Sequence, residues 1–446
     1  MSASLQINAR WIITVDANDR VLHHHAMIIL DDKIIDILPQ DEALKYDAAE
    51  VITLDDHALA PGFINAHTHA AMSLLKGLAD DLALDEWLSE HIWPAESALV
   101  DQNFVRAGSE LAIAEMIKGG TTCFNDMYFF IDETASAASR AGIRVNIGIP
   151  IIDFPTRWAK DLDEYISKGL LVKDQFRHDA LVNFSFSPHA PYTVSDESFQ
   201  RIQPLMNELG LSMHIHAHET ASEVTDSFEV YGKSPLNRLN DLTLLGPNLM
   251  MVHMTALNGE DIQLLAKNAV HVIHCPESNL KLASGFCPVS DLLDAGINVA
   301  LGTDGSASNN DIDMLGEMRS AALLAKGVSG KADCLSAHEA LRMATINGAK
   351  ALGLSEAIGS LEIGKQADLF AINLNCIETQ PIYDVISSLV YSANRSQISD
   401  VWVDGKRLMH DHVLTTIDEL SVLERTKQWH QKIAPFHHFV SKNGVK

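Results

Sequence analysis

The sequence predicts a parallel (β/α)8 barrel joined to a small β-sandwich that the two ends of the chain build together. Eight short apolar segments alternate with helix-like segments between residues 61 and 357. This alternation is typical of parallel βα units, and eight is the strand number of the closed barrel. Shorter β-like runs flank this region, and because chain ends often lie together, we expect them to form one composite sandwich. A chain of 446 residues, 47% of them hydrophobic, is large enough for both parts.

The two flanking segments read as β structure. The predicted domains are 1–60 for the N-terminal part of the sandwich, 61–357 for the barrel, and 358–446 for the C-terminal part of the sandwich with a terminal helix. Alternating or apolar runs between Asp, Asn or Pro turns predict strands at 5–15, 25–30, 33–38, 50–54, 367–373 and 400–403, and helical periodicity predicts a helix at 419–433. The three consecutive histidines 23–25 are interpreted as surface or strand-edge residues.

The barrel elements alternate along the chain. The predicted strands are 63–69, 121–128, 144–151, 182–189, 212–219, 249–255, 270–276 and 298–304. Helical patterns between them include 103–118, 195–208, 259–269 and 336–352, and the first, second and last begin near Asp, Ser or Asn residues that can cap a helix.

Titratable side chains accumulate where the predicted barrel strands end. They are His67, His69, Asp126, His189, His216, Glu219, His253, His274 and Asp304. In such barrels the chemistry sits at the C-terminal ends of the strands, and buried His, Asp or Glu side chains must be paired or coordinated. The pattern therefore predicts a functional site at this end of the barrel.

A metal site is the first reading of these residues. His67 and His69 are two apart on a strand and therefore face the same way, although one H-x-H has little weight in a chain with 21 histidines. In the segment 213–219, alternation places His214, His216 and His218 on one face, so periodicity does not choose among them. Asp304 ends a strand between two glycines, which permit close backbone approach. Three histidines and one aspartate suit one divalent ion, Zn²⁺ first, with Fe²⁺, Mn²⁺ or Ni²⁺ as alternatives.

The expected chemistry is hydrolysis. A bound metal lowers the pKa of its water from ~15.7 to ~7, which supplies hydroxide at neutral pH. Glu219 is positioned to reach the substrate and carry a proton, and His253 to hydrogen-bond the hydroxide. Three plainer readings stay open: Glu219 as a helix N-terminal carboxylate, and His253 and His274 as core histidines.

Composition excludes several other classes. The net charge of −26 opposes binding to nucleic acid or to an anionic membrane. The sequence shows neither a signal-peptide pattern nor an apolar run of ~18 residues, so no membrane association is expected. Five scattered cysteines without a C-x-x-C motif predict reduced thiols in a cytoplasmic protein.

Several motifs in order along the chain carry a family resemblance. They are PGFINAHTHAAMSLLKGLADD (61–81), EWLSEHIWPAE (86–96), GGTTCFNDMYF (119–129), SPHAPYTVS (187–195), HIHAHET (214–220), VIHCPESNLKLASGFCPV (272–289), LGTDGSASNNDIDMLGEMR (301–319) and GSLEIGKQADL (359–369). With these motifs the chain resembles the amidohydrolase superfamily, and within it the deaminases of 5′-methylthioadenosine and S-adenosylhomocysteine. Ser187-Pro188-His189 stands where dinuclear relatives carry a bridging lysine, so the resemblance implies a single metal.

The resemblance also implies residue roles. The metal ligands would be His67, His69, His216 and Asp304. Glu219 would carry a proton to N1 of the purine, His253 would orient the attacking hydroxide, and Asp304 would pass the hydroxide proton to the departing ammonia. Attack at C6 would give the inosine-type product. Trp87, Glu96 and His189 would face the nucleoside, with Glu96 accepting hydrogen bonds from the ribose hydroxyls, although Trp87 also suits a helix residue packed on the barrel.

The 5′ substituent of the substrate is the least determined point. A homocysteine tail calls for a cationic partner, whereas a methylthio group needs an apolar slot. Arg157 is the only arginine between residues 145 and 176, and 149–154 is largely apolar, so 5′-methylthioadenosine is favoured, with S-adenosylhomocysteine and adenosine as further substrates. Arg157 as a plain surface charge stays open, as does a homo-oligomer that uses 149–154 as an interface. The alternative function is a related aminohydrolase or chlorohydrolase acting on guanine, an s-triazine or another heterocycle.

Overall fold

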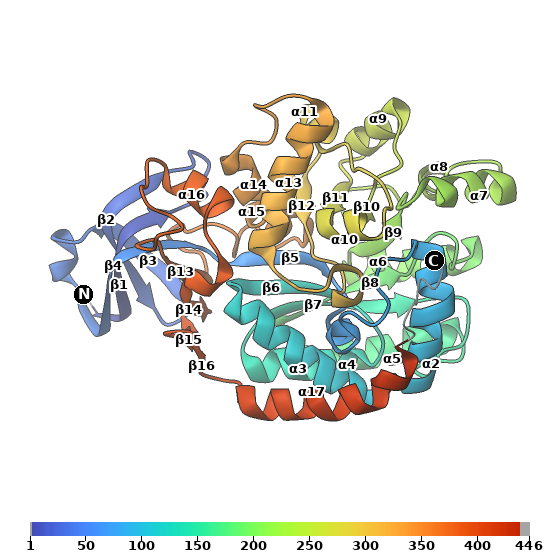
Figure 1. The fold of residues 1–446 in the computed structure, drawn as a ribbon, viewed down its shortest axis with the longest axis horizontal. Helices are drawn as coiled ribbons and strands as arrows, with labels where there is room; N and C mark the ends of the chain where they lie inside the picture. The colour runs from blue at the N-terminus through green and yellow to red at the C-terminus, as the bar shows by residue number, and fades with distance from the viewer. Residues whose placement is uncertain (1, 438–446) are drawn as a thin grey trace, which may run out of the picture.

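The computed structural model describes residues 2–437, and these residues contain two eight-stranded sheets (Figure 1). One is a parallel sheet whose neighbouring strands follow one another in the chain, from β5 to β12. The other is a mixed sheet built from both ends of the chain. The predicted fold class is therefore confirmed.

The parallel sheet closes into a barrel. Its strands are β5 (Phe63–Thr68), β6 (Thr121–Met127), β7 (Arg144–Ile151), β8 (Val182–Pro188), β9 (Met213–Ala217), β10 (Leu249–His253), β11 (His271–His274) and β12 (Val299–Leu301). At the seam, the Asn65 side chain donates to Thr303 Oγ1 at 2.7 Å and accepts from the Thr303 amide at 3.0 Å. The Asp304 amide donates to the His67 carbonyl at 3.0 Å. The first and last strands thus meet beside the predicted site.

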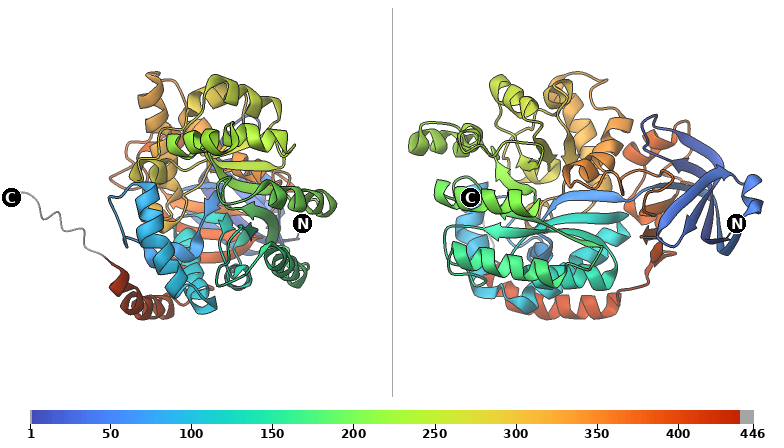
Figure 2. Two further views of the ribbon diagram at one scale, coloured as in Figure 1. Left: turned by 90° about the vertical axis from the view of Figure 1, so that its right-hand side faces the viewer. Right: turned by 180° about the vertical axis from the view of Figure 1, so that it is seen from behind.

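Helices surround the barrel strands, as both views in Figure 2 show. They are α3 (Gln102–Lys118), α4 (Ile131–Ala141), α5 (Leu162–Gln175), α6 (Asp196–Leu209), α7 (Ala221–Tyr231), α8 (Pro235–Asp241), α9 (Gly259–Lys267), α10 (Pro276–Lys281), α11 (Val289–Asp294), α12 (Ser306–Asn309), α13 (Met314–Ser329), α14 (Ala337–Met343) and α15 (Ile346–Ala351). Side chains cap them as expected: Asp101 accepts from Phe104 N at the start of α3, and Ser195 accepts from Ser198 N at the start of α6.

The helix predicted at 336–352 is two helices, α14 and α15. The break lies at Thr345, where φ is −133° and ψ is −98°. The Ala344 carbonyl just before it accepts a hydrogen bond from the Ile64 amide of β5 at 2.9 Å. A backbone acceptor that periodicity had assigned to the helix is therefore used by the barrel.

Segments from both ends of the chain form the mixed sheet. Its strands are β1 (Ser2–Ile13), β2 (Val21–Leu30), β3 (Lys33–Pro39), β4 (Asp47–Pro61), β13 (Leu369–Asn373), β14 (Ile398–Val403), β15 (Lys406–His410) and β16 (Val413–Leu414), and the antiparallel pair β4–β13 joins the two segments. The turn after β2 packs on the turn after β14 so closely that a Cβ at Gly405 would lie 2.2 Å from the Asp31 carbonyl oxygen. The sheet therefore curls over one apolar core, to which both chain ends contribute.

The mixed sheet packs against the N-terminal ends of the barrel strands. Arg144, the first residue of β7, donates to both carboxylate oxygens of Asp368 at 3.1 and 3.3 Å and to Asp404 at 2.5 Å. Helix α17 (Glu419–Ile433) follows the sheet and lies along α3, with Trp429 against Phe104 (Figure 1). The mixed sheet does not cover the C-terminal ends of the barrel strands, and a cavity lies there. The boundaries at 60 and 357 stay predictions.

A segment of short helical turns follows β5 and covers the C-terminal end of the barrel. It comprises η2 (Ala70–Leu75), α1 (Leu84–Glu86), the π-helical turn η3 (Trp87–Ile92) and α2 (Trp93–Leu99). Single π-helical turns are rare and are frequent at functional sites.

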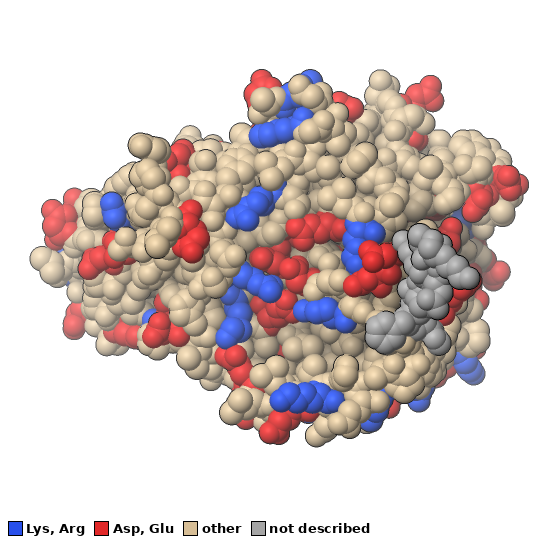
Figure 3. Space-filling view, in the orientation of Figure 1, with Lys and Arg blue, Asp and Glu red and all other residues tan. Residues whose placement is uncertain are grey.

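The surface charges and the helices bear on the predictions of no nucleic-acid partner and no membrane association. On the face in Figure 3, Lys and Arg lie among Asp and Glu rather than in a basic patch. Of the helices within residues 2–437, none is long and apolar enough to cross a membrane.

Candidate metal centre and substrate cavity

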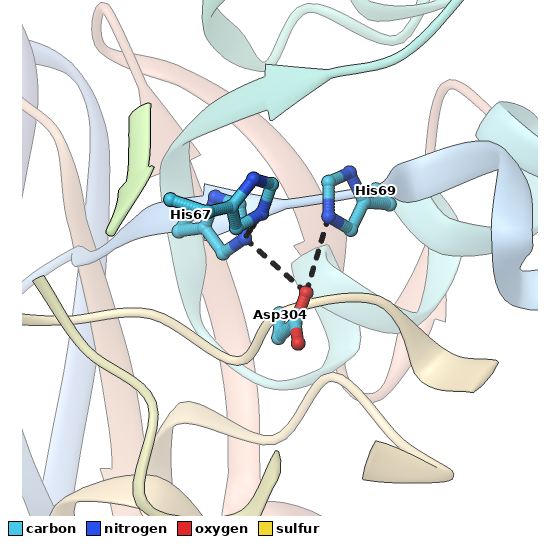
Figure 4. Close-up of side chains that lie close together, drawn as sticks. His67, His69 and Asp304 are labelled. Carbon is cyan, nitrogen blue, oxygen red and sulfur yellow. Dashed lines mark hydrogen bonds and ion pairs between the residues drawn. The ribbon is translucent and has the colours of Figure 1, made fainter. Parts of the chain in front are cut away.

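Four side chains from three strand ends meet in one cluster. His67 and His69 come from the end of β5, His216 from β9, and Asp304 from the turn after β12, and one ligand atom of each lies within 4.8 Å of the others. Figure 4 shows the rings of His67 and His69 directed at the same Asp304 oxygen, Oδ1, which lies 3.2 Å from His67 Nε2 and 3.3 Å from His69 Nε2. The Nε2 atoms of His67 and His216 face each other at 3.2 Å.

The other nitrogen of each ring has its own partner. His69 Nδ1 lies 2.5 Å from the Met127 carbonyl, and His216 Nδ1 lies 2.7 Å from the His189 carbonyl. Since a carbonyl only accepts, both Nδ1 atoms carry a proton, and the Nε2 atoms turn toward the cluster. His67 Nδ1 contacts His214 Nε2 at 3.0 Å. Three ring nitrogens and a carboxylate converge on one point, and the neutral rings with the carboxylate suit a divalent cation.

The structure separates the three histidines that alternation left equivalent. His214 contacts the Nδ1 side of the His67 ring, which faces away from the cluster. His218 Nδ1 bonds the Ala256 carbonyl at 2.7 Å, and its Nε2 accepts from the Leu236 amide at 3.1 Å. Only His216 of the three contributes to the cluster.

Asp304 is held firmly. Its Oδ2 accepts from Ser278 at 2.6 Å and from Ser308 at 2.8 Å, and its Oδ1 accepts from the Gly305 amide at 2.7 Å. Its backbone is left-handed, with φ at 62°, which a non-glycine residue adopts at a cost. These bonds fix the direction of the carboxylate.

Burial and the single carboxylate set the protonation of the cluster. Burial lowers the pKa of His67 to about 4 and holds the pKa of His216 well below its ordinary value. For His69, burial lowers the pKa, but the hydrogen bond and charge of Asp304 outweigh it and raise the pKa to about 9. Without a cation, one imidazolium therefore balances the Asp304 carboxylate, and the other two rings are neutral.

Glu219 lies beside the cluster in a cradle of three neighbours. Its amide donates to Glu223 at 2.7 Å, its carbonyl accepts from Thr255 at 2.7 Å, and its Oε1 accepts from Ser284 at 3.2 Å. Burial raises the pKa of the Glu219 carboxyl. The cap of α7 is Thr220, so the plainer reading of Glu219 as a helix-terminal carboxylate does not describe its side chain.

His253 faces Glu219. Its Nε2 lies 3.7 Å from Glu219 Oε2, and its Nδ1 lies 2.8 Å from Asn279 Oδ1. Its φ of 75° is left-handed, as at Asp304. When the Nδ1 proton is donated to Asn279, the Nε2 lone pair remains free on the side of the cavity.

A cavity of about 470 Å³ lies over the cluster and is bounded by His69, His216, Glu219, His253 and Asp304. Its walls are mainly apolar, with Trp87, Leu88, Trp93, Phe129, Phe130, Ile152, Phe154 and Trp158. Glu96, Arg157 and His189, all predicted to face the substrate, also line it. His274 is not among the described residues that line the cavity, which favours its reading as a core histidine.

The predicted substrate residues differ in their surroundings. Trp87 is buried in the cavity wall. Glu96 accepts from the Tyr128 hydroxyl at 2.6 Å, and burial raises its pKa. His189 Nδ1 bonds Thr193 Oγ1 at 2.9 Å, and burial lowers its pKa to about 4, so it is a neutral ring. Arg157 is exposed and donates to the Ala98 carbonyl at 3.0 Å, which ties the loop after β7 to α2.

Comparison with known proteins agrees with this geometry. The model of the amidohydrolase family matches residues 58–408, which is most of the chain and includes all four clustered residues. The chain belongs to the amidohydrolase family. The resemblance predicted from the motifs and the prediction of a hydrolytic enzyme are thereby confirmed.

Individual relatives of this amidohydrolase are similar over nearly their whole length. A 5-methylthioadenosine/S-adenosylhomocysteine deaminase of Teredinibacter turnerae is 49% identical over 96% of this chain and 97% of its own. A 5′-deoxyadenosine deaminase of Methanosarcina acetivorans is 40% identical over 95% and 97%. The crystal structure of an adenosine deaminase from Xanthomonas campestris with bound zinc has a TM-score of 0.96 at 46% identity and covers 97% and 99%. An atrazine chlorohydrolase from Arthrobacter aurescens, at 23% identity, 95% and 99% coverage and a TM-score of 0.89, shares the fold.

Sequence reasoning missed the residues that orient the site of this amidohydrolase. They are Tyr128, Glu223, Thr255, Ser278, Asn279, Ser284 and Ser308. Most are small polar residues, a type that does not by itself indicate a catalytic or metal-binding role. Their position after a barrel strand could have indicated it, since Ser278, Asn279 and Ser284 follow β11 in the stretch 276–284.

Proposed function

We propose that this amidohydrolase is a zinc-dependent deaminase of purine nucleosides that converts 5′-methylthioadenosine to the corresponding inosine product and ammonia. The observation that carries the proposal is that one cavity is lined both by His69, His216 and Asp304 of the His₃Asp cluster and by Glu96. The cluster suits hydrolysis, and Glu96 suits a sugar that carries hydroxyl groups.

The carboxylate of Glu96 favours a nucleoside over a bare heterocycle. A carboxylate accepts hydrogen bonds from two adjacent hydroxyls, which ribose offers and guanine or a triazine does not. The names of the two relatives above and of the zinc-containing structure agree, since each denotes a deaminase of an adenosine derivative.

Zinc is proposed as the single ion held by His67, His69, His216 and Asp304. Three imidazole nitrogens and one carboxylate are ligands that Zn²⁺ accepts, and the adenosine deaminase at 46% identity contains zinc. The bound ion would lower the pKa of a water molecule from ~15.7 to ~7.

The remaining steps belong to side chains of the chain itself. His253 Nε2, freed by the bond from Nδ1 to Asn279, accepts a hydrogen bond from the attacking water and orients it toward C6 of the purine. Glu219, whose pKa burial raises, carries a proton to N1. Asp304 takes the second proton of the water and delivers it to the departing amine. The C6–O bond forms first, as N1 gains its proton and C6 becomes tetrahedral. The C6–N bond breaks afterwards, once the amine is protonated, and ammonia leaves.

The apolar wall favours a small uncharged 5′ group. Phe154, Ile152 and Trp158 line the cavity after β7, and the nearby cation, Arg157, already bonds the Ala98 carbonyl. A methylthio group can bury its surface there, whereas the charged homocysteine end needs a counterion. We propose S-adenosylhomocysteine and adenosine as secondary substrates.

A substrate panel tests the function. Zinc-loaded protein is assayed by loss of adenine absorbance with 5′-methylthioadenosine, S-adenosylhomocysteine and adenosine, and by product analysis with guanine. The highest kcat/KM is expected for 5′-methylthioadenosine. Turnover of guanine equal to or above that of every nucleoside would overturn the proposal.

A further inference from the structure

Tyr128 makes a hydrogen bond that the proposed mechanism leaves unused. Its hydroxyl donates to Glu96 Oε1 at 2.6 Å, and its side chain is 6% exposed. A short O–H···O bond from a buried phenol is typical of a charge-assisted bond to an ionised carboxylate. Within residues 2–437, the hydrogen bonds of Glu96 include none to its other oxygen, Oε2. Glu96 therefore has one oxygen held and one available.

The position of Tyr128 in the chain gives this bond its significance. Tyr128 directly follows Met127, the last residue of β6, whose carbonyl accepts from His69 at 2.5 Å. Two consecutive residues thus hold two parts of the site: Met127 orients a ligand of the proposed metal, and Tyr128 orients the proposed acceptor for ribose. Because Met127 and Tyr128 are consecutive, the end of β6 fixes the position of Glu96 relative to His69.

Glu96 needs such an anchor. It lies on α2, which has no side-chain cap and is preceded by the π-helical turn η3. A carboxylate on this segment has its own rotamer freedom, and holding it in one direction in advance lowers the entropic cost of binding. The strand end supplies a fixed point that the covering segment lacks.

We propose that Tyr128 is a positioning residue for sugar recognition, which holds the Glu96 carboxylate so that Oε2 meets a hydroxyl of the ribose. This inference rests on the proposed nucleoside deaminase function. A purely structural Tyr128 would pack its ring in the wall beside Phe129, and the loss of its hydroxyl would then weaken all substrates alike.

The test combines a protein change with a substrate change. Tyr128→Phe keeps the ring and removes only the donor. For wild type and variant, kcat/KM is measured with adenosine and with its 2′-deoxy and 3′-deoxy analogues, together with zinc content and thermal unfolding. We expect the preference for the hydroxylated substrate to fall about ten-fold in the variant, the size of one hydrogen bond to a charged group, and mainly through KM.

Two further variants sharpen the result. Tyr46→Phe is the matched control, because Tyr46 donates to Asp36 at 2.8 Å in the mixed sheet, far from the cavity, and its loss should leave the hydroxyl preference unchanged. In a Glu96→Ala background, Tyr128→Phe should no longer change the preference. This cycle also works if Tyr128→Phe alone lowers stability, because it compares ratios between substrates.

The outcomes separate the two proposals. Wild-type protein that deaminates no nucleoside refutes the proposed function. Wild-type activity with an equal loss on all three substrates in Tyr128→Phe overturns the positioning role and leaves the function standing. A reduced hydroxyl preference that depends on Glu96 supports both.

Discussion

Replacing Glu219 by glutamine is the most direct test of the proton path. The substitution keeps the size of the side chain and an oxygen that can accept from Ser284. The bonds of the Glu219 backbone to Glu223 and Thr255 are untouched, and the four clustered ligand atoms belong to other residues. Glu219→Gln should therefore fold and load zinc as the wild type does.

The expected loss follows from what the amide cannot do. Glutamine cannot hold and release the proton for N1, and positioned general acid–base groups contribute about 10²–10⁴-fold to rate. A loss of that size corresponds to about 3–5 kcal/mol of activation free energy. Because the cavity wall is unchanged, KM should change little and the loss should fall on kcat.

The assay is single-substrate turnover of 5′-methylthioadenosine by loss of adenine absorbance, with metal analysis of the same sample. Glu197→Gln is the matched control, since Glu197 is an exposed glutamate in the first turn of α6. Zinc-loaded Glu219→Gln with kcat within a factor of about three of the wild type would remove Glu219 from the mechanism, because it contradicts the general acid contribution.

Four further predictions concern the sugar, the metal, the pH dependence of stability and the fold. Glu96→Ala should lower kcat/KM for nucleosides far more than for free adenine, and an equal loss on both in parallel assays would contradict the ribose contact. Zinc binding at pH 7 should release about one proton from His69, in addition to any proton lost by metal-bound water, because His69 has a pKa of about 9 in the metal-free cluster and must be neutral to bind. The His69 share should vanish as the pH rises above that value, and calorimetry in buffers of different ionisation enthalpy measures the release. The same raised pKa contributes stability to the metal-free protein below about pH 6.5 that is lost as the pH rises through about 9. Arg144→Met should lower the free energy of unfolding by about 3–5 kcal/mol, since it leaves the buried Asp368 carboxylate and the partly buried Asp404 carboxylate without their cation. Urea unfolding measures this against Arg201→Met, which breaks an exposed pair and should shift the midpoint little.

The strands were predictable because their physical signal is local. Each of the eight barrel strands falls inside its predicted segment, since a buried parallel strand is a short apolar run bounded by polar residues. The prediction of one continuous helix at 336–352 was wrong, because a contact with a residue distant in the sequence interrupts it. Its Ala344 carbonyl accepts from Ile64, 280 residues earlier in the chain, and no sequence window around Ala344 contains that information.

In the candidate site, too, local sequence patterns predicted some residues, and contacts between distant residues decided the others. His67, His69 and Asp304 could be found from strand ends, because titratable residues in apolar segments stand out. The choice of His216 over its neighbours could not, since it depends on which ring finds a backbone or side-chain partner elsewhere: His218 bonds Ala256, and His214 bonds His67. Alternation fixes the face of a side chain and not its partner.

The orienting partners share one feature that connects the fold to the chemistry. His69 is held from the end of β6, His216 from the end of β8, and His253 by Asn279 of α10, the helix that follows β11. Each of these three histidines is thus oriented by a residue at or after the end of another barrel strand.

This arrangement makes the proposed metal site a property of the closed barrel. His67 on the first strand and Asp304 after the last approach to 3.2 Å only where the seam is closed, and the Asp304 amide bonds the His67 carbonyl at the same place. An ion held by these two residues would join the two sides of the seam and would bind the unfolded chain weakly. Its binding free energy therefore adds to the stability of the barrel. Opening of the seam would release the metal before the rest of the fold is lost, so activity should fail at a lower denaturant concentration than the helical signal does.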